Sequence, residues 1–405
     1  MSRVLFTGGQ VFDGTGSDRA AGDVVVEDGR IVDVGTGLDG DVSVDCTGLT
    51  VLPGFFDCHV HVVMSGVDLL RQLQLPFSYQ FYEAARNLRR TLEQGITTVR
   101  DAGGADLGIQ RAVADGLIPG PRMQISVNVI SQTGGHGDDW MPSGQCAGPW
   151  IPHPGRPDAI ADGPDDMRRV ARTLLRAGAQ VLKVCTTGGV LSPGDDPRHS
   201  QFTPEELQVL VAEARMQGRH VMAHAQGAEG IKNAVRAGIR SIEHGIFLDD
   251  EAIELMLEHR TWLVPTLVAP LAVIRAVKAG ASLPAEMVRK AEEVAEVHAE
   301  SVRRAVEAGV RIAMGTDSGV GPHGENLEEL PLMQACGLSP AQVLAATTSS
   351  SAELLGHGDE LGRLAPGYRA DLVLVSGDAF DLAALPGGIQ QVWRDGVRVI
   401  PSTVD

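Results

Sequence analysis

Residues 306–317 read VEAGVRIAMGTD: a helix-like segment that stops at Gly309, then a short apolar strand and a closing carboxylate. Glycine provides the left-handed conformation that ends a helix, and a nearly continuous apolar run is typical of a buried parallel strand. The same order recurs in four other segments: LEQGITTVRD (92–101), LRAGAQVLKV (175–184), RMQGRHVMAH (215–224) and VRAGIRSIEH (235–244). The repeat predicts alternating strands and helices around a parallel sheet.

The number of such units is close to eight. Strands are predicted to end near residues 58–61, 101, 130, 183, 224, 244, 266 and 316–317, with helices over 164–177, 204–217, 229–237, 250–259 and 286–308. Eight units favour an α/β fold of the (β/α)8 TIM-barrel type over residues 54–356. The alternative is an open doubly wound sheet, which is disfavoured because no stretch resembles its glycine-rich phosphate turn.

Both ends of the chain differ from its centre and contain short alternating strands with glycine turns. Examples are RVLFTGG (3–9), DVVVEDGRIVDVG (23–35) and IQQVWRDGVRV (389–399). Because neither end can bury a core alone, residues 1–53 and 357–405 are predicted to form one small composite β-sandwich domain. The long irregular stretch 131–163, which holds Trp140 and Trp150, is expected to be a lid or a binding loop.

Composition excludes several classes of partner. The chain of 405 residues has 52 acidic and 34 basic side chains and a net charge of −18, which disfavours binding to nucleic acid or to an anionic membrane surface. No apolar run approaches the roughly 18 residues of a membrane span, and the N-terminal stretch lacks the pattern of a secretion signal. The five scattered cysteines show no CxxC pair, so we expect reduced thiols and a cytoplasmic location. With nucleic acid and membrane disfavoured, the expected partner is a small-molecule substrate.

Polar residues close several of the predicted strands. In a barrel enzyme the carboxyl ends of the strands carry the catalytic groups, and residues two apart on a strand share a face. Each histidine alone reads as a core residue bonded to backbone, but their joint arrival at one rim with a carboxylate indicates a divalent-metal site. The residues of this set are His59, His61, Lys183, His224, His244 and Asp317. Five other histidines are expected to be ordinary surface or loop residues: His153, His220, His259, His298 and His357.

Lys183 is the unusual member of this set, because it lies inside an apolar strand. Burial and nearby cations both lower the pKa of a lysine, and a neutral amine can add CO₂ to form a carbamate. Such a carbamate is an anionic ligand with two oxygens and would bridge two metal ions. The alternative is a lysine in a salt bridge with Asp101 or Glu243.

Several motifs together resemble those of the amidohydrolase superfamily. They are DCHVH (57–61), VLKVCTTGG (181–189), MAHAQGAEGI (222–231), SIEHG (241–245), AMGTDSGV (313–320) and the tail LGRLAPGYRADLVLV (361–375). TGGHGD (133–138), GPHGEN (321–326) and SSSAELLG (349–356) resemble its binuclear-metal branch of Xaa-Pro and Xaa-Arg dipeptidases and imidazolonepropionase-like amide hydrolases. The resemblance spans nearly the whole chain and implies a homo-oligomer with two divalent ions, zinc being the expected metal.

The family pattern assigns roles to the predicted ligands. His59, His61 and Asp317 correspond to residues that hold the more buried ion, and His224 and His244 to residues that hold the second ion. The resemblance also implies that N6-carboxylated Lys183 bridges the two ions.

Two further positions follow from the resemblance. His136 stands where such enzymes place a residue near the substrate carbonyl, and its expected role is to donate a hydrogen bond to the developing oxyanion. The alternative for His136 is a loop histidine turned to solvent. Gln226 occupies a position where many relatives have a second histidine. It is not expected to bind metal, and the family's substrate contacts near it are not carried over.

The predicted function is hydrolysis of an amide bond in a dipeptide or an N-acyl amino acid. A metal-bridging hydroxide attacks the carbonyl, and Asp317 transfers the proton to the leaving amine. One alternative applies the same chemistry to a cyclic amide, lactone, carbamate or aryl-amide xenobiotic. A non-enzymatic barrel with a structural metal is disfavoured because structural zinc normally has four closed ligands. Loops that follow the strands supply the candidate substrate-binding residues: Tyr79, Tyr82, Trp140, Arg198, His199 and His323.

Overall fold

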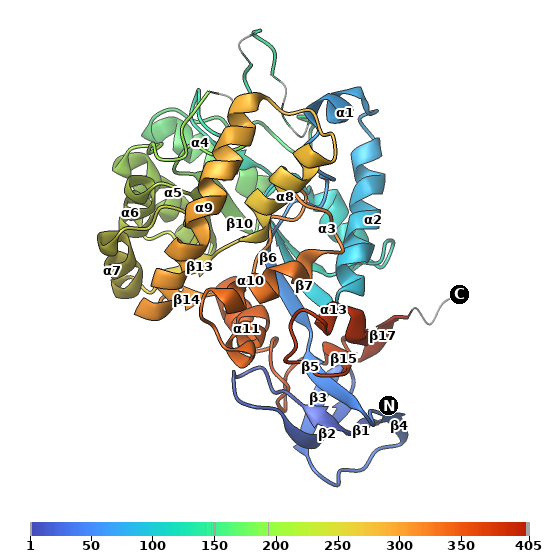
Figure 1. The fold of residues 1–405 in the computed structure, drawn as a ribbon. Helices are drawn as coiled ribbons and strands as arrows, with labels where there is room; N and C mark the ends of the chain where they lie inside the picture. The colour runs from blue at the N-terminus through green and yellow to red at the C-terminus, as the bar shows by residue number, and fades with distance from the viewer. Residues whose placement is uncertain (1, 142, 147, 149–150, 193, 402–405) are drawn as a thin grey trace.

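The computed structural model describes residues 2–141, 143–146, 148, 151–192 and 194–401, so Trp150 lies outside the described residues. The fold is mixed α/β (Figure 1), and short parallel strands form its centre. These strands are β6 (Phe55–Val60), β7 (Ile96–Asp101), β8 (Arg122–Ile125), β9 (Val129–Ile130), β10 (Val181–Cys185), β11 (His220–Ala225), β12 (Ser241–His244), β13 (Trp262–Val264) and β14 (Arg311–Ile312).

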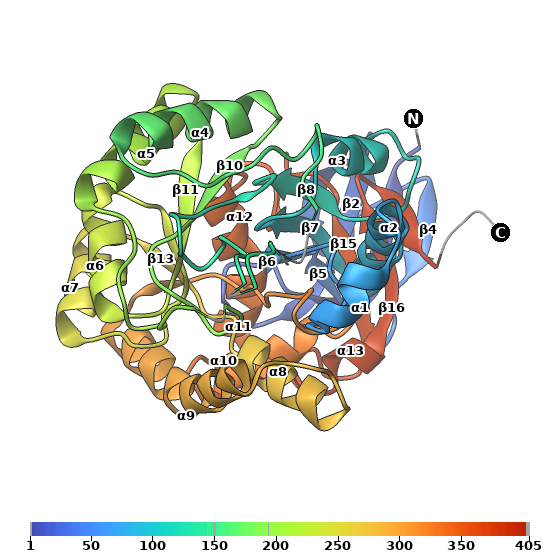
Figure 2. The ribbon, with the colours of Figure 1, turned by 90° about the horizontal axis from the view of Figure 1, so that it is seen from above.

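Two sheets make up this centre, and backbone hydrogen bonds join them on both sides. One sheet has the order β6-β7-β8 and the other the order β14-β13-β12-β11-β10-β9. At one junction Gln180 N donates to Ile125 O over 2.8 Å, and at the other Asp317 N donates to His59 O over 2.7 Å. Helices surround the strands when the molecule is viewed from above (Figure 2).

Two strands differ in detail from the prediction. The strand predicted to end near residue 130 is split into β8 and β9, because the backbone turns at Val127, which has a φ of 70°. The strand predicted to end at residues 316–317 is regular only to Ile312. Beyond that point the backbone still follows β6, since Cys58 N donates to Met314 O over 2.9 Å.

The five predicted helices are confirmed to within two residues at each end. They are α4 (Pro164–Arg176), α5 (Pro204–Met216), α6 (Ala228–Ala237), α7 (Asp250–Glu258) and α9 (Ala285–Ala308). Gly238 and Gly309 end α6 and α9 in the left-handed conformation, as the sequence pattern predicts. The other helices are α1 (Leu69–Gln74), α2 (Tyr79–Glu93), α3 (Leu107–Ala114), α8 (Val268–Lys278), η1 (Asn326–Glu328), α10 (Glu329–Ala335), α11 (Pro340–Thr347), α12 (Ser349–Leu355) and α13 (Leu385–Gly388).

The two ends of the chain meet in a second β structure, which lies below the helices in Figure 1. Its strands are β1 (Val4–Val11), β2 (Ala20–Glu27), β3 (Arg30–Gly35), β4 (Val42–Asp45), β5 (Leu49–Pro53), β15 (Leu372–Ser376), β16 (Ile389–Arg394) and β17 (Val397–Ile400). The N-terminal β5 pairs antiparallel with the C-terminal β15. Hydrogen bonds join all eight strands in one continuous sheet. Phe6, Ile31 and Leu372 from both ends share its apolar core.

Two observations bear on partners and redox state. Across the described part of the chain, no helix combines the length and the apolar character that a membrane crossing needs. All five cysteines are free thiols, and Cys146 is the exposed one among them.

Candidate functional site

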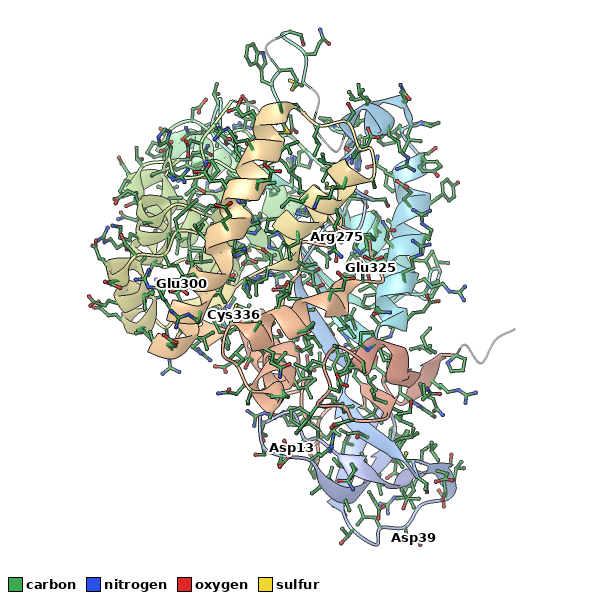
Figure 3. The ribbon with its side chains drawn as sticks, viewed as in Figure 1. Asp13, Asp39, Arg275, Glu300, Glu325 and Cys336 are labelled. Atoms are coloured by element: carbon green, nitrogen blue, oxygen red, sulfur yellow. The ribbon has the colours of Figure 1, made fainter. Side chains whose placement is uncertain are left out.

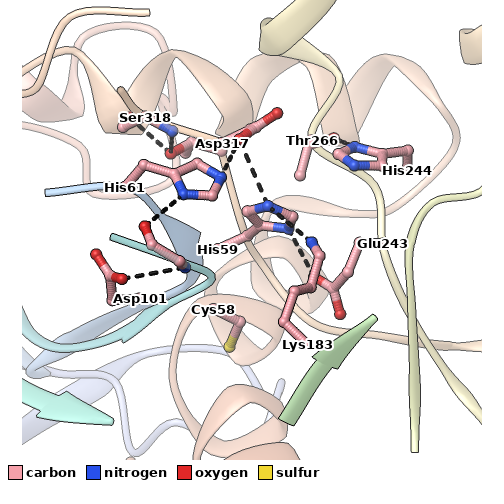
Figure 4. Close-up of polar contacts among 12 residues, drawn as sticks. Cys58, His59, His61, Asp101, Lys183, Glu243, His244, Thr266, Asp317 and Ser318 are labelled. Carbon is pink, nitrogen blue, oxygen red and sulfur yellow. Dashed lines mark hydrogen bonds and ion pairs between the residues drawn. The ribbon is translucent and has the colours of Figure 1, made fainter. Parts of the chain in front are cut away.

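The first part of the site comes from β6 and from the loop after β14. His59 lies in β6, next to its last residue, and His61 directly follows the strand. Asp317 Oδ1 lies 3.1 Å from His61 Nε2 and 3.4 Å from His59 Nε2 (Figure 4). Burial opposes charge on this carboxyl, but His59, His61 and Lys183 outweigh burial and lower the pKa of Asp317. The carboxylate is therefore ionised at neutral pH.

Lys183 points from β10 toward the same group of side chains (Figure 4). Its Nζ lies 3.4 Å from His59 Nε2, and burial lowers its pKa. The alternative prediction, a salt bridge from Lys183 to Asp101 or to Glu243, is wrong, because both acids bind other groups. Glu243 pairs with Arg100 and His59 at 2.8 Å each, and Asp101 accepts backbone N–H groups such as that of Val62.

His224 and His244 extend the group across β11 and β12. Their ring centroids are 4.6 Å apart, and the ring of His244 lies 5.2 Å from that of His59. Thr266 Oγ1 lies 2.7 Å from Nδ1 of His244. Burial lowers the pKa of His59, His224 and His244 well below the usual range. These imidazoles are therefore neutral, which is the form that binds metal.

Three residues of the site hold a backbone conformation that is unusual outside glycine. The φ angles are 76° at His244, 51° at Thr266 and 59° at Asp317. Positive φ is a genuine outlier for a β-branched residue such as threonine, and such strain concentrates at functional sites. The chain keeps these conformations where they direct side chains into one space.

The side chains of this group fit a divalent cation. One atom each from His59, His244 and Asp317 lies within 4.8 Å of the other two. Asp317 Oδ1 is buried, and Nε2 of His59 and Nε2 of His61 both lie within 3.4 Å of it. Neutral imidazole and carboxylate are the ligands that zinc and related metals prefer. The structure brings all six predicted ligands together in one continuous set of contacts.

A buried network outside this group orients His59. Glu243 Oε2 accepts from Nδ1 of His59, which leaves Nε2 directed at Asp317. Arg100 and Ser241 bind the other oxygen of Glu243 over 2.8 and 2.5 Å. A carboxylate behind a histidine is a common way of fixing the tautomer of a metal ligand.

His136 lies in the loop after β9 and faces the site rather than solvent. Its ring stacks on that of His224 with a centroid separation of 4.2 Å. Ser192 Oγ lies 2.7 Å from Nδ1 of His136 and also bonds Asp195. Gly189 allows this approach, because a Cβ at that position would lie 2.2 Å from the imidazole.

The site opens into a cavity of about 640 Å³. Much of its wall is apolar, with Val190, Ile246, Val273, Val294 and Val320 among the lining residues. None of the six predicted substrate-binding residues lines this cavity. Tyr79, Tyr82 and Trp140 are exposed, and Trp140 borders an adjoining cavity of about 240 Å³. Arg198 and His199 border a separate cleft. His323 is buried behind His61, and its Nε2 lies 3.2 Å from the backbone carbonyl oxygen of His61.

The cavity also contains residues that the sequence analysis did not assign. His298 was predicted to be an ordinary surface or loop residue, and this prediction is wrong, because His298 is buried and lines the cavity. Its Nε2 lies 2.9 Å from the carbonyl oxygen of His244. The helical pattern of residues 286–308 places His298 on the buried face of α9, which is the signal that identifies it. Ser192 and Asp195 lie in a loop and carry no comparable pattern.

Comparisons with known proteins agree with this geometry. The chain matches the amidohydrolase family over residues 50–399. It is 34% identical to ochratoxinase of Aspergillus niger over 85% of this chain and 75% of the relative. A crystal structure of a Xaa-Pro dipeptidase with bound methionine superposes with a TM-score of 0.90 at 32% identity, covering 98% of this chain and 99% of the other. A crystal structure of an amidohydrolase reaches a TM-score of 0.91 at 36% identity over the whole of both chains. The chain is therefore a hydrolase, and it belongs to the amidohydrolase family.

Proposed function

We propose that this protein is a metal-dependent hydrolase that cleaves the amide bond of a dipeptide or an N-acyl amino acid. The observation that carries the proposal is the convergence of Asp317 Oδ1 with Nε2 of His59 and Nε2 of His61 in the wall of a cavity. The relatives named Xaa-Pro dipeptidase and ochratoxinase support an amide as the substrate bond.

The same side chains would hold two divalent ions, zinc being the expected metal. His59, His61 and Asp317 would bind one ion, and His224 and His244 the other. Lys183, carboxylated on Nζ, would bridge them. The lowered pKa of Lys183 supports this modification, because only a neutral amine adds CO₂.

The reaction assigns one task to each residue. When bound, the pair of ions lowers the pKa of water toward neutrality and polarises the scissile carbonyl. Asp317 accepts the proton of the attacking water and transfers it to the leaving nitrogen. His136 donates an N–H to the carbonyl oxygen as negative charge develops there. Glu243 keeps His59 in one orientation throughout.

The architecture of the protein is part of the same proposal. The circuit of hydrogen bonds through β6–β14 supports an eight-stranded (β/α)8 barrel over residues 54–356, with β8 and β9 as two pieces of one strand. The continuous terminal sheet supports a small domain built from residues 1–53 and 357–405. A homo-oligomer in the cytoplasm completes the proposed description.

The apolar cavity wall favours a second candidate substrate class. Aliphatic side chains from the loop after β10 and from α8 and α9 surround much of the space beyond the histidines. Such a wall suits a cyclic amide, lactone, carbamate or aryl amide with a large apolar group. Turnover of aryl amides without turnover of dipeptides would select this class.

Removal of metal tests the proposal directly. The purified protein is expected to hold at least about one equivalent of metal, and a chelator should abolish hydrolysis of a library of L-Xaa-L-Xaa dipeptides and N-acyl amino acids. Metal content is measured by elemental analysis, and activity by release of free amine. Adding back zinc should restore activity. Full activity in metal-free protein would contradict the proposal.

The contact between Ser192 and His136 provides a second test. Ser192→Ala removes the hydroxyl that holds Nδ1 of His136, so the imidazole loses its fixed orientation. We expect kcat to fall by about tenfold to a hundredfold, with little change in KM, because the hydrogen bond strengthens in the transition state. Ser17→Ala, at an exposed serine near the chain start, is the control. An unchanged kcat in Ser192→Ala would remove His136 from the mechanism as described.

A further inference from the structure

Two buried side chains of α9 hold the backbone at the end of β12. His298 and Ser301 are three residues apart, so they lie on the same face of the helix. Nε2 of His298 lies 2.9 Å from the carbonyl oxygen of His244. Ser301 Oγ donates to the carbonyl oxygen of the next residue, Gly245, over 2.8 Å. The helix therefore contacts the backbone of a proposed metal ligand from outside the strands.

The backbone held in this way has an unusual conformation. The φ angles are 76° at His244 and 64° at Gly245. Positive φ is uncommon outside glycine, and it persists only where the surrounding structure over-determines it. Thr266 Oγ1 lies 2.7 Å from Nδ1 of His244 (Figure 4), so this residue is held at its side chain as well as at its carbonyl. Without the contact from His298, the backbone of His244 is freer to relax and to turn the imidazole away from the site.

The ring of His298 directs its polar contacts to the backbone. A carbonyl oxygen only accepts, so the contact with His244 requires a hydrogen on Nε2 of His298. The carbonyl group of Pro265, directly after β13, also acts on this ring as an acceptor. Nδ1 of His298 is buried and has no hydrogen-bond partner in the part of the chain that the structure describes. The N–H of His298 thus serves the backbone at the ends of β12 and β13.

We propose that His298 is a positioning residue for metal binding, whose Nε2–H fixes the backbone of His244 so that the imidazole of His244 faces the ion that it would bind. This inference rests on the proposed function and adds a support that comes from a helix. His298 acts through His244 and needs no contact with the ion or with the reacting groups. Groups that orient metal ligands from behind are worth about tenfold to a hundredfold in metal affinity.

The experiment compares zinc affinity in wild-type protein, His298→Leu and His298→Gln. Leucine keeps an apolar side chain in the cavity wall and removes the N–H, whereas the amide of glutamine can reach the carbonyl oxygen of His244. Competition with a chromogenic chelator measures the affinity, and the visible absorption of cobalt-substituted protein reports the arrangement of the ligands. We expect His298→Leu to bind one ion about tenfold to a hundredfold more weakly and to change the cobalt spectrum. His298→Gln should recover most of the affinity and the wild-type spectrum.

Controls separate this inference from folding and from the parent proposal. His259→Leu, at an exposed histidine after α7, should match wild type. Thermal unfolding of the metal-free proteins shows whether each variant folds. If His298→Leu does not fold, His298→Asn replaces it, because its amide is too short to reach the carbonyl of His244. Wild-type affinity and spectrum in the folded variant without the N–H, or an equal loss in His298→Gln, would overturn the role of His298. A wild-type protein that binds no metal would instead contradict the proposed function itself.

Discussion

Replacing Asp317 by asparagine is expected to lower kcat by about 10²–10⁴-fold, the range associated with loss of a positioned general base. Asparagine keeps the shape of the side chain but accepts no proton at neutral pH. The lowered pKa of Asp317 means that the wild-type carboxylate is ready to accept one. Amine release from the best dipeptide of the library measures the effect.

The same substitution should also weaken metal binding, because Oδ1 lies within 3.4 Å of Nε2 of both His59 and His61. Elemental analysis of the variant separates the two losses: activity that stays low after metal is restored reflects the missing base. Asp39→Asn is the matched control, since Asp39 lies at the far end of the terminal sheet (Figure 3). An Asp317→Asn protein with full activity would contradict both substrate classes proposed for the site.

The sequence predicts much of the fold because the decisive signals are local. A glycine that ends a helix and an apolar run that follows it depend on neighbouring residues only, so α4 to α7 and α9 lie where the pattern indicates. The predictions fail where tertiary contacts decide. Val127 turns the third strand into two pieces, and residues after Ile312 follow β6 without regular strand geometry.

The sequence likewise predicts one part of the site, the residues on the strands, and misses the other part, the wall of the substrate cavity. His59, His224 and His244 lie at or next to the last residue of their strands, and Lys183 lies in the middle of β10. The parallel pairing of neighbouring strands brings them to one rim. The substrate wall depends instead on how long loops and helices cover that rim. This is why Tyr82 was expected at the cavity but is exposed. The helical pattern of α9 places His298 on the buried face, but it does not indicate that this face borders the cavity.

Lys183→Ala is expected to reduce metal content and to lower kcat by about a hundredfold or more, since even residues that only support metal ligands are worth about tenfold to a hundredfold in affinity or activity. The proposed bridge is a carbamate on Nζ, and alanine removes the nitrogen that would carry it. Lys278→Ala, at an exposed lysine that ends α8, should leave metal content and kcat unchanged.

The Lys183→Ala variant leaves space for a small molecule, so it allows a rescue experiment as well as a measurement of lost activity. A short carboxylic acid such as acetate or propionate offers the same two oxygens as a carbamate, so adding it should restore part of the metal content and part of the activity. A chloride salt at equal ionic strength should not. Lys183 Nζ contacts Nε2 of His59 over 3.4 Å, and it forms no ion pair within 4.0 Å with a carboxylate of the described residues, so no salt bridge is lost that would explain such a rescue. Two tightly held ions in Lys183→Ala without added acid would mean that the histidines and Asp317 suffice, and the carbamate bridge would then have to be abandoned.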